Sequence, residues 1–265
     1  MRRWKSKACL KCPEPVAHAL DWLTARPVAH RGLHNAAAGI IENTPAAVRA
    51  AVAAGYGIEV DLQVSADGEA MVHHDDVLGR LTEGEGRLDR MSAADLKRVP
   101  FRGSDARMMS LGELCDLVGG AQVPILPELK GRFDGDARLP LRVAAVLSGY
   151  RGPVAPMSFD PMQLSVLRQK APGLPRGIVA AKYRPHPYWD QMPPRLRRGM
   201  GSLLPALPCR PQFVAYAVDN LPALAPFLAR HILCLPLLTW VVRTPVERRR
   251  AERWADQMIF ENFRP

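Results

Sequence analysis

Short apolar runs alternate with helical patterns along almost the whole chain, and this alternation restricts the fold more than any other feature of the sequence. Turn residues separate the apolar runs, which predicts strands at 27–29, 57–64, 69–74, 123–129, 154–159, 177–181, 213–218, 235–242 and 258–260. Helical patterns occupy 45–54, 93–99, 110–118, 139–148, 161–170 and 246–255. Strands joined by helices favour a mostly parallel sheet, and about eight of them can close into a barrel. We therefore expect an α/β fold whose roughly eight strands close into a (β/α)8 barrel.

One connection is too short for a helix, because only a few residues separate the run 57–64 from the run 69–74. Asp67-Gly68 between them is a favoured pair for a two-residue type I′ turn. Such a turn would pair Asp61 with His74, and Glu59, two positions away, would share their face. The sequence thus predicts a somewhat irregular barrel with a β-hairpin after the second strand, and a cluster of Glu59, Asp61 and His74.

The chain of 265 residues suits a single barrel domain at 26–265, preceded by a basic segment and lead-in helix at 1–25. The sequence indicates where the first barrel helix begins. Asn43 and Thr44 can cap free N–H groups, and Pro45 lacks an N–H at a position where that group would have no partner within the helix. Gly55 is expected to end it. No motif occupies the Pro- and Arg-rich stretch Tyr183–Pro211, which could cover the barrel mouth.

The formal charge of +10 allows a nucleic-acid or membrane surface, although solvation explains it as well. The basic clusters lack interleaved aromatic residues for base stacking, so we expect no nucleic-acid partner and leave peripheral membrane contact open. No apolar run approaches the roughly 20 residues of a membrane span, and the start lacks the apolar stretch of a signal peptide. Oligomeric state is not determined by these features.

The five cysteines, at positions 9, 12, 115, 209 and 234, are odd in number and scattered, which argues against a disulfide framework. Cys9 and Cys12 have zinc-knuckle spacing, but no second pair completes a four-ligand site. Together with the missing signal peptide, the cysteines favour a cytoplasmic location.

Two carboxylates on one strand face are costly unless a cation neutralises them, and Glu128 adds a third acid at the end of the apolar run 123–129. Oxygen ligands of this kind suit Mg²⁺ or Ca²⁺, with Mn²⁺ as a further option. We expect Glu59, Asp61 and Glu128 to hold one divalent cation. The alternative is that these acids lie on the surface, paired with Lys and Arg.

His30, Arg31 and Gly32 follow the first apolar run and bring an imidazole, a guanidinium and a flexible backbone point to one strand end. This combination suits a phosphate group, although a lone tripeptide also arises by chance. Of the adjacent histidines, the hairpin selects His74 for the site and leaves His73 a structural role.

These segments together resemble the glycerophosphodiester phosphodiesterase family. The resemblance lies in AHRG at 29–32, ENT at 42–44, GIEVDLQVSADG at 57–68, HDD at 74–76 and ELKG at 128–131, with weaker matches at SFD, TWVV and MIFENF. It implies a TIM-barrel hydrolase in which His30 and His74 are the acid–base pair and Glu59, Asp61 and Glu128 bind the metal.

The resemblance also implies roles around this centre. Arg31 and Lys130 would contact the phosphate, Trp240 would form an aromatic wall beside the glycerol, and Glu42 would support the first histidine from behind. Val241, Arg243 and the pair Phe260-Glu261 depart from the family pattern, which leaves the choice of substrate open.

The expected reaction is hydrolysis of a glycerophosphodiester to glycerol 3-phosphate and an alcohol, by metal-assisted acid–base catalysis. The attacking oxygen could come from water or from the glycerol 2-hydroxyl. A first alternative is a lysophospholipase D-like enzyme acting on lipids, whose marker would be an apolar groove near Tyr183–Pro211. A second alternative is a barrel that binds phosphodiesters without turning them over, which would not need both histidines.

Overall fold

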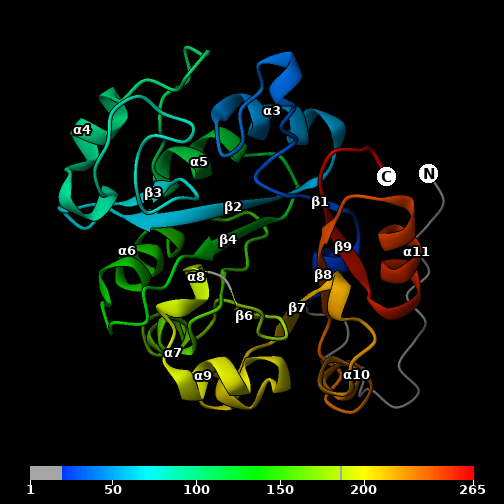
Figure 1. The fold of residues 1–265 in the computed structure, drawn as a ribbon. Coiled ribbons are helices and arrows are strands. Elements are labelled where there is room, and N and C mark those ends of the chain that lie inside the picture. The colour runs from blue at the N-terminus through cyan, green and yellow to red at the C-terminus, as the bar shows by residue number, and fades with distance from the viewer. Residues whose placement is uncertain (1–19, 186) are drawn as a thin grey trace.

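The computed structural model describes residues 20–185 and 187–265, and its strands form a closed parallel barrel surrounded by helices (Figure 1). The strand order is β1-β9-β8-β7-β6-β5-β4-β2, and β1 also pairs with β2, which closes the ring. The barrel strands are β1 (Val28–Ala29), β2 (Gly57–Val64), β4 (Ile125–Leu129), β5 (Met157–Ser158), β6 (Gly177–Ala180), β7 (Phe213–Ala217), β8 (Leu237–Val242) and β9 (Gln257–Phe260). The expected TIM barrel is confirmed.

Each helix expected from the sequence is present: α3 (Pro45–Ala54), α4 (Ala93–Arg98), α5 (Leu111–Val118), α6 (Arg138–Leu147), α7 (Pro161–Lys170) and α11 (Pro245–Trp254). The sequence patterns missed α8 (Pro187–Asp190), α9 (Pro194–Gly199) and α10 (Leu224–His231), while α2 (Asp21–Thr24) lies where a lead-in helix is expected. The start of α3 is as predicted for Thr44, whose side chain accepts a hydrogen bond from the Ala47 N–H, and Gly55 ends the helix with a φ of 73°. The Asn43 side chain does not cap the helix but binds Asp61.

The hairpin after β2 is present, but its predicted register was wrong by one residue. Strand β3 (Ala70–Val72) runs antiparallel to β2 outside the ring and pairs Leu62 with Val72. The Ser65 N–H donates to the Glu69 carbonyl, so three residues, rather than two, form the turn. The Asp67 carboxylate accepts from the Ser65 hydroxyl and from the Ala93 N–H, which stabilises this wider turn.

As a result of this shift, His73, not His74, follows β3 opposite Asp61, and its N–H donates to the Asp61 carbonyl at 3.0 Å. The His73 ring is buried near Phe101, at 6.3 Å between ring centroids. The ring lies beside a second, smaller hydrophobic core that is separate from the main one. This second core consists of Met71, Leu78, Leu88, Leu96, Phe101 and Met108. His74 comes one residue later, after the strand has ended.

The cysteines differ from expectation at one position. Cys115 and Cys209 are free and buried, whereas Cys234 is disulfide-bonded, so the cysteine argument for a cytoplasmic location loses its support. The Cys9 and Cys12 pair lies outside the described residues. Among the helices of the described ranges, none has the length and apolar character needed to cross a bilayer.

Candidate active site

Three acidic residues meet where β2 and β4 lie side by side. The parallel register pairs Asp61 directly with Glu128, and Glu59 lies two residues earlier on β2. One carboxylate oxygen from each lies within 4.8 Å of the others, and all three side chains are buried. The predicted grouping of Glu59, Asp61 and Glu128 is therefore present, buried in the barrel beside the positive charges of Lys130 and Arg31.

The charges around this cluster are divided unevenly. Burial and the charges of Asp61 and Glu128 raise the pKa of Glu59 well above its usual range. Burial would also raise the pKa of Asp61, but Lys130 and Arg31 hold it well below its usual range. The Oε1 atom of Glu59 is buried without a hydrogen-bond partner. An orphaned carboxylate oxygen beside two further acids is a donor set that fits a divalent cation.

The His30-Arg31-Gly32 turn brings the chain from β1 against this cluster. Arg31 has a φ of 57°, and its N–H donates to Glu59 Oε2 at 2.8 Å. Gly32 has a φ of 77°, and a Cβ there would lie 2.8 Å from the Ala47 carbonyl carbon on α3. Only glycine fits this close approach of the turn to the helix.

His30 is held by a residue that the sequence reasoning did not select. Glu261, just after β9, places Oε2 at 2.6 Å from His30 Nδ1, and its other oxygen pairs with Arg243. His30 Nε2 lies 3.9 Å from Glu59 Oε2. Burial lowers the pKa of His30 despite the hydrogen bond with Glu261. In the sequence, Glu261 falls only within the weak match at 258–263 and is part of the departure Phe260-Glu261 from the family pattern.

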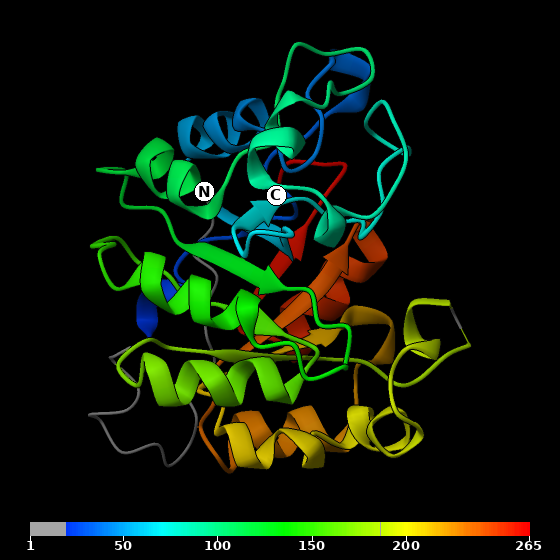
Figure 2. The ribbon, with the colours of Figure 1, turned by 90° about the vertical axis from the view of Figure 1, so that its left-hand side faces the viewer.

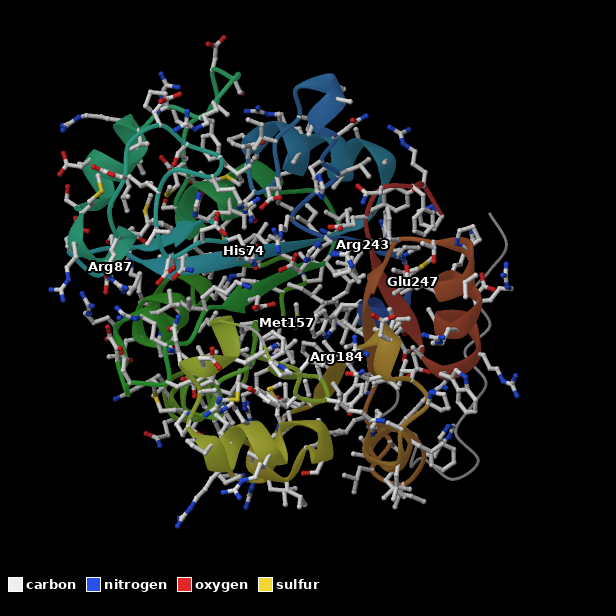
Figure 3. The ribbon with its side chains drawn as sticks, in the orientation of Figure 1. His74, Arg87, Met157, Arg184, Arg243 and Glu247 are labelled. Atoms are coloured by element: carbon white, nitrogen blue, oxygen red, sulfur yellow. The ribbon has the colours of Figure 1, made fainter. Side chains whose placement is uncertain are left out.

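Glu42, which the resemblance places behind His30, joins a chain of ion pairs. It accepts from Arg31 Nη1 and from Arg80 Nη2, each at 2.7 Å. Arg80 also donates to Asp75, whose second oxygen lies 2.7 Å from His74 Nδ1. This chain of ion pairs connects His74 with Arg31, and Figure 3 shows His74 near the middle of the view, beside the β2 ribbon.

Both histidines thus have the same arrangement. A carboxylate engages Nδ1 of each ring, Glu261 for His30 and Asp75 for His74. Such a bond fixes the orientation and tautomer of an imidazole and leaves Nε2 for proton transfer. The geometry therefore suits two imidazoles prepared for acid–base chemistry.

Lys130 contacts the acidic cluster directly, whereas the contacts of Trp240 are with Phe159 and the backbone of β7. Lys130 Nζ lies 2.6 Å from Glu128 Oε1 and 2.7 Å from Asp61 Oδ1, so its ammonium bridges two of the acids. Trp240, on β8, donates from Nε1 to the Ala215 carbonyl and packs edge-on against Phe159. Its contacts are with this aromatic and backbone surface, and its place beside a glycerol group stays a prediction.

Another residue missed by the sequence reasoning supports Asp61. Asn43 donates from Nδ2 to Asp61 Oδ2 at 2.8 Å, and its Oδ1 accepts from the Asp61 N–H. Asn43 therefore fixes the carboxylate as well as the strand that carries it.

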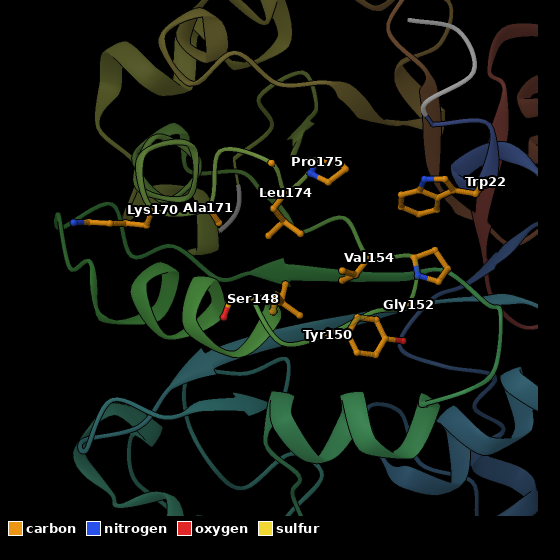
Figure 4. Close-up of a pocket in the computed structure, with 12 residues that line it drawn as sticks. Trp22, Ser148, Tyr150, Gly152, Val154, Lys170, Ala171, Leu174 and Pro175 are labelled. Atoms are coloured by element: carbon orange, nitrogen blue, oxygen red, sulfur yellow. The ribbon is translucent and has the colours of Figure 1, made fainter. Parts of the chain in front are cut away.

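A separate pocket of about 470 Å³ lies at the other end of the barrel (Figure 4). Trp22, Val154 and Pro175 line it, and each precedes a strand of the barrel. TIM-barrel enzymes place their chemistry at the carboxyl ends of the strands. This pocket is therefore not the candidate active site.

A TIM barrel with buried acids and two oriented histidines at the carboxyl ends of its strands has the layout of a barrel hydrolase. Residues 30–262 match the model of the glycerophosphoryl diester phosphodiesterase family. The chain belongs to this family, which confirms the expected enzyme class, a glycerophosphodiester phosphodiesterase.

Comparison with individual proteins agrees with this assignment. The chain is 26% identical to a glycerophosphodiester phosphodiesterase of Caldanaerobacter subterraneus, over 65% of this chain and 79% of the relative. It is 36% identical to human glycerophosphodiester phosphodiesterase 1 over 93 residues, which cover 33% of this chain and 27% of the relative.

Solved structures share the fold. A phosphodiesterase from Oleispira antarctica, in complex with the product sn-glycerol-3-phosphate, superposes with a TM-score of 0.71 at 18% identity, over 90% of this chain and 94% of the other. A glycerophosphodiester phosphodiesterase from Thermotoga maritima gives a TM-score of 0.62 at 24% identity, over 89% and 94%.

Proposed function

We propose that the protein hydrolyses glycerophosphodiesters to glycerol 3-phosphate and an alcohol, with His30 and His74 as the acid–base pair. The observation that carries this proposal is the shared arrangement of the two imidazoles, each bound by a carboxylate at Nδ1. One ring takes the proton of the attacking oxygen, and the other gives a proton to the departing alkoxide. The Oleispira antarctica structure with bound sn-glycerol-3-phosphate supports the choice of product.

Glu59, Asp61 and Glu128 would hold one divalent cation, Mg²⁺ or Ca²⁺, with Mn²⁺ the further candidate. The unpartnered Oε1 of Glu59 and the close approach of the three carboxylates support this assignment. When bound, the cation polarises a phosphoryl oxygen and neutralises the surrounding negative charge.

Arg31 and Lys130 would bind the phosphate. Both side chains are largely buried beside Asp61, at 3.2 Å for Arg31 Nε and 2.7 Å for Lys130 Nζ. With the acids neutralised by a cation, these two positive groups are available to phosphate oxygens. Trp240 would bound the glycerol side of the substrate. Cytoplasmic location and the lack of a nucleic-acid partner remain predictions.

A turnover panel tests the proposal, with glycerophosphocholine, glycerophosphoethanolamine, glycerophosphoglycerol and a lysolipid, each with Mg²⁺, Ca²⁺ or chelator. We expect metal-dependent release of glycerol 3-phosphate from at least one of the soluble diesters. Glu128→Gln should lose metal binding and turnover but keep the fold, whereas Asp116→Asn, an exposed acid on α5, should resemble the wild type. Turnover of the Glu128 variant at the wild-type rate would contradict its assignment as a metal ligand.

A lysophospholipase D-like activity is the second candidate, because its expected marker is present. An apolar groove of about 960 Å³ lies beside the stretch Tyr183–Pro211, with Leu204 and Leu207 from that stretch in its lining. Faster turnover of the lysolipid than of every soluble diester would favour this candidate.

A further inference from the structure

The same groove opens on a surface that holds none of the residues proposed for the hydrolysis of soluble diesters. It lies between the stretch α9, η3 (Met200–Ser202) and η4 (Leu204–Cys209) on one side and α10 on the other. Figures 1 and 2 both show α9 and α10 at the lower edge of the molecule, and η3 contacts α10. Large aliphatic side chains project from this surface, with exposed fractions of 65% for Leu204, 62% for Leu207, 73% for Leu224, 68% for Ile232 and 58% for Leu233.

The amphipathic character of α10 explains why this surface is apolar. Pro226 and Ala229 are its buried residues, and Arg230 pairs with Asp256 at 2.7 Å. Leu224 and Leu228, four positions apart, remain on the outer side, with Phe227 also exposed. The only arginine of α10 is therefore held in an ion pair, and the outer side presents hydrocarbon to water. We refer to Leu204, Leu207, Leu224, Phe227, Leu228, Ile232 and Leu233 as the α10 face.

The charged residues that line the groove are all basic. Lys182, Arg197 and Arg198 contribute to the lining, and no aspartate or glutamate does. Arg197 lies over the Tyr183 ring and 3.4 Å from Asp190, whereas Arg198 donates to the Pro194 carbonyl. The complementary partner is therefore apolar at its centre and negatively charged around it.

One side of the groove beside the α10 face reaches the catalytic end of the barrel, whereas Leu207, Ile232 and Leu233 of the face precede β7 and β8 at the other end. Lys182 follows the carboxyl end of β6, and Pro222 follows β7, so both belong to the same barrel end as the acidic cluster. Figure 3 shows the neighbouring Arg184 in the central region of the view. A surface bound to the α10 face would thus adjoin the catalytic end of the barrel at Lys182 and Pro222.

We propose that the α10 face docks on the surface of an anionic phospholipid bilayer. The exposed aliphatic side chains would enter the boundary between headgroups and acyl chains, and the basic rim would contact lipid phosphates. A bilayer satisfies both observations at once, because it accepts aliphatic groups from several separate elements without a matching shape and supplies the negative charge. This inference adds to the proposed function and does not depend on it.

Co-sedimentation of the full-length protein with vesicles tests the proposal. Vesicles of phosphatidylcholine mixed with phosphatidylglycerol should bind the wild type, and vesicles of phosphatidylcholine alone should bind it less. Added salt should weaken binding to the anionic vesicles, because it screens the basic rim. The double variant Leu224→Gln/Leu228→Gln should weaken binding on the order of tenfold. Arg197→Gln/Arg198→Gln should do so by a similar factor, with a smaller dependence on salt.

Matched controls use exposed residues outside the α10 face. Leu141→Gln/Val246→Gln removes two exposed aliphatic side chains, and Arg107→Gln/Arg151→Gln removes two exposed arginines. Both should bind vesicles like the wild type. All four variants should turn over soluble diester at the wild-type rate, since none of these residues belongs to the proposed site.

Three results would overturn the proposal: no wild-type binding to anionic vesicles, equal losses in the face and control variants, or self-association that only the face variants abolish. The last result would identify a second copy of the chain as the occupant. Vesicle binding without diester turnover would refute the proposed function and leave the docking proposal intact.

Discussion

At the scale of single residues, the site is organised by partners of the histidines rather than by the histidines alone. The carboxylates of Glu261 and Asp75 engage the Nδ1 atoms of His30 and His74. Both imidazoles are therefore oriented by acidic residues that lie outside the acidic cluster of Glu59, Asp61 and Glu128. The orientation of the histidines and the binding of a metal can therefore be tested with separate variants.

The leaving group of the substrate should separate the two histidines. A nitrophenolate leaving group needs little protonation, whereas choline or glycerol leaves as a strongly basic alkoxide. We expect the alanine variant of the general acid, at His30 or His74, to lose about 10²–10⁴-fold on natural substrates and to recover much of this loss on the activated one. The variant of the general base should stay impaired with both, as measured by steady-state kinetics. Equal losses of both variants on both substrates would contradict divided roles.

Glu261 should act as a positioning residue for His30. Glu261→Gln is expected to lower kcat by about 10- to 100-fold, because a misoriented imidazole transfers protons poorly, while KM and metal affinity change little. Glu261→Asp should restore part of the rate. Kinetics together with metal titration by calorimetry provide the test, and Glu252→Gln on α11 is the control. A loss of metal affinity equal to the loss in kcat would show that Glu261 supports the metal site instead.

At the scale of secondary-structure elements, the turn after β1 depends on its contact with α3. Gly32 and Gly120 both have positive φ, of 77° and 84°, but only Gly32 has a neighbour in the way of a Cβ. Gly32→Ala should lower the free energy of unfolding by more than Gly120→Ala, with a difference of about 1–3 kcal/mol from overpacking. Urea denaturation measures both values.

Gly32→Ala should also reduce turnover, because it displaces His30 and Arg31 from the acidic cluster. If Gly32→Ala and Gly120→Ala lost similar stability and both kept full turnover, the turn would accommodate the added Cβ and the prediction would be wrong.

At the scale of the whole molecule, metal binding should be coupled to the stability of the barrel. The pKa of buried Glu59 is raised in the folded protein, so the folded state favours its protonated form. Its contribution to stability is complete below the unfolded pKa and is lost as the pH rises through the folded pKa. In the presence of chelator, the melting temperature of the wild type should therefore decrease relative to that of Glu59→Gln as the pH is raised above the ordinary pKa range of a glutamate.

Added metal should make the wild type more stable than Glu59→Gln at the same pH. The wild type should be stabilised by about 2.7 kcal/mol at a free metal concentration of 100 times Kd, and Glu59→Gln by much less. Differential scanning calorimetry with and without chelator measures the effect, with the exposed Glu85→Gln as the control. A Glu59→Gln variant that gains as much from metal as the wild type would remove Glu59 from the ligand set.

The local sequence pattern was sufficient for the barrel and for the members of the acidic cluster. Period-two and helical patterns are local properties, and they predicted β2 and α3 with their exact ends. The abrupt change from aliphatic residues to Glu128 likewise predicted a strand end with a candidate functional residue. The glycine-containing turn after β2 predicted a hairpin correctly.

The tertiary structure decided the relations between segments far apart in the chain. The pairing of Asp61 with Glu128 depends on the stagger of neighbouring parallel strands, which no local pattern encodes. The hairpin register depended on the Asp67 carboxylate, which accepts hydrogen bonds from the Ser65 hydroxyl and from the backbone N–H of Ala93 on another element. Glu261 reaches His30 only because β9 pairs with β1 and closes the barrel across 231 positions of sequence. Local periodicity thus determined the elements, and closure of the ring determined which side chains meet.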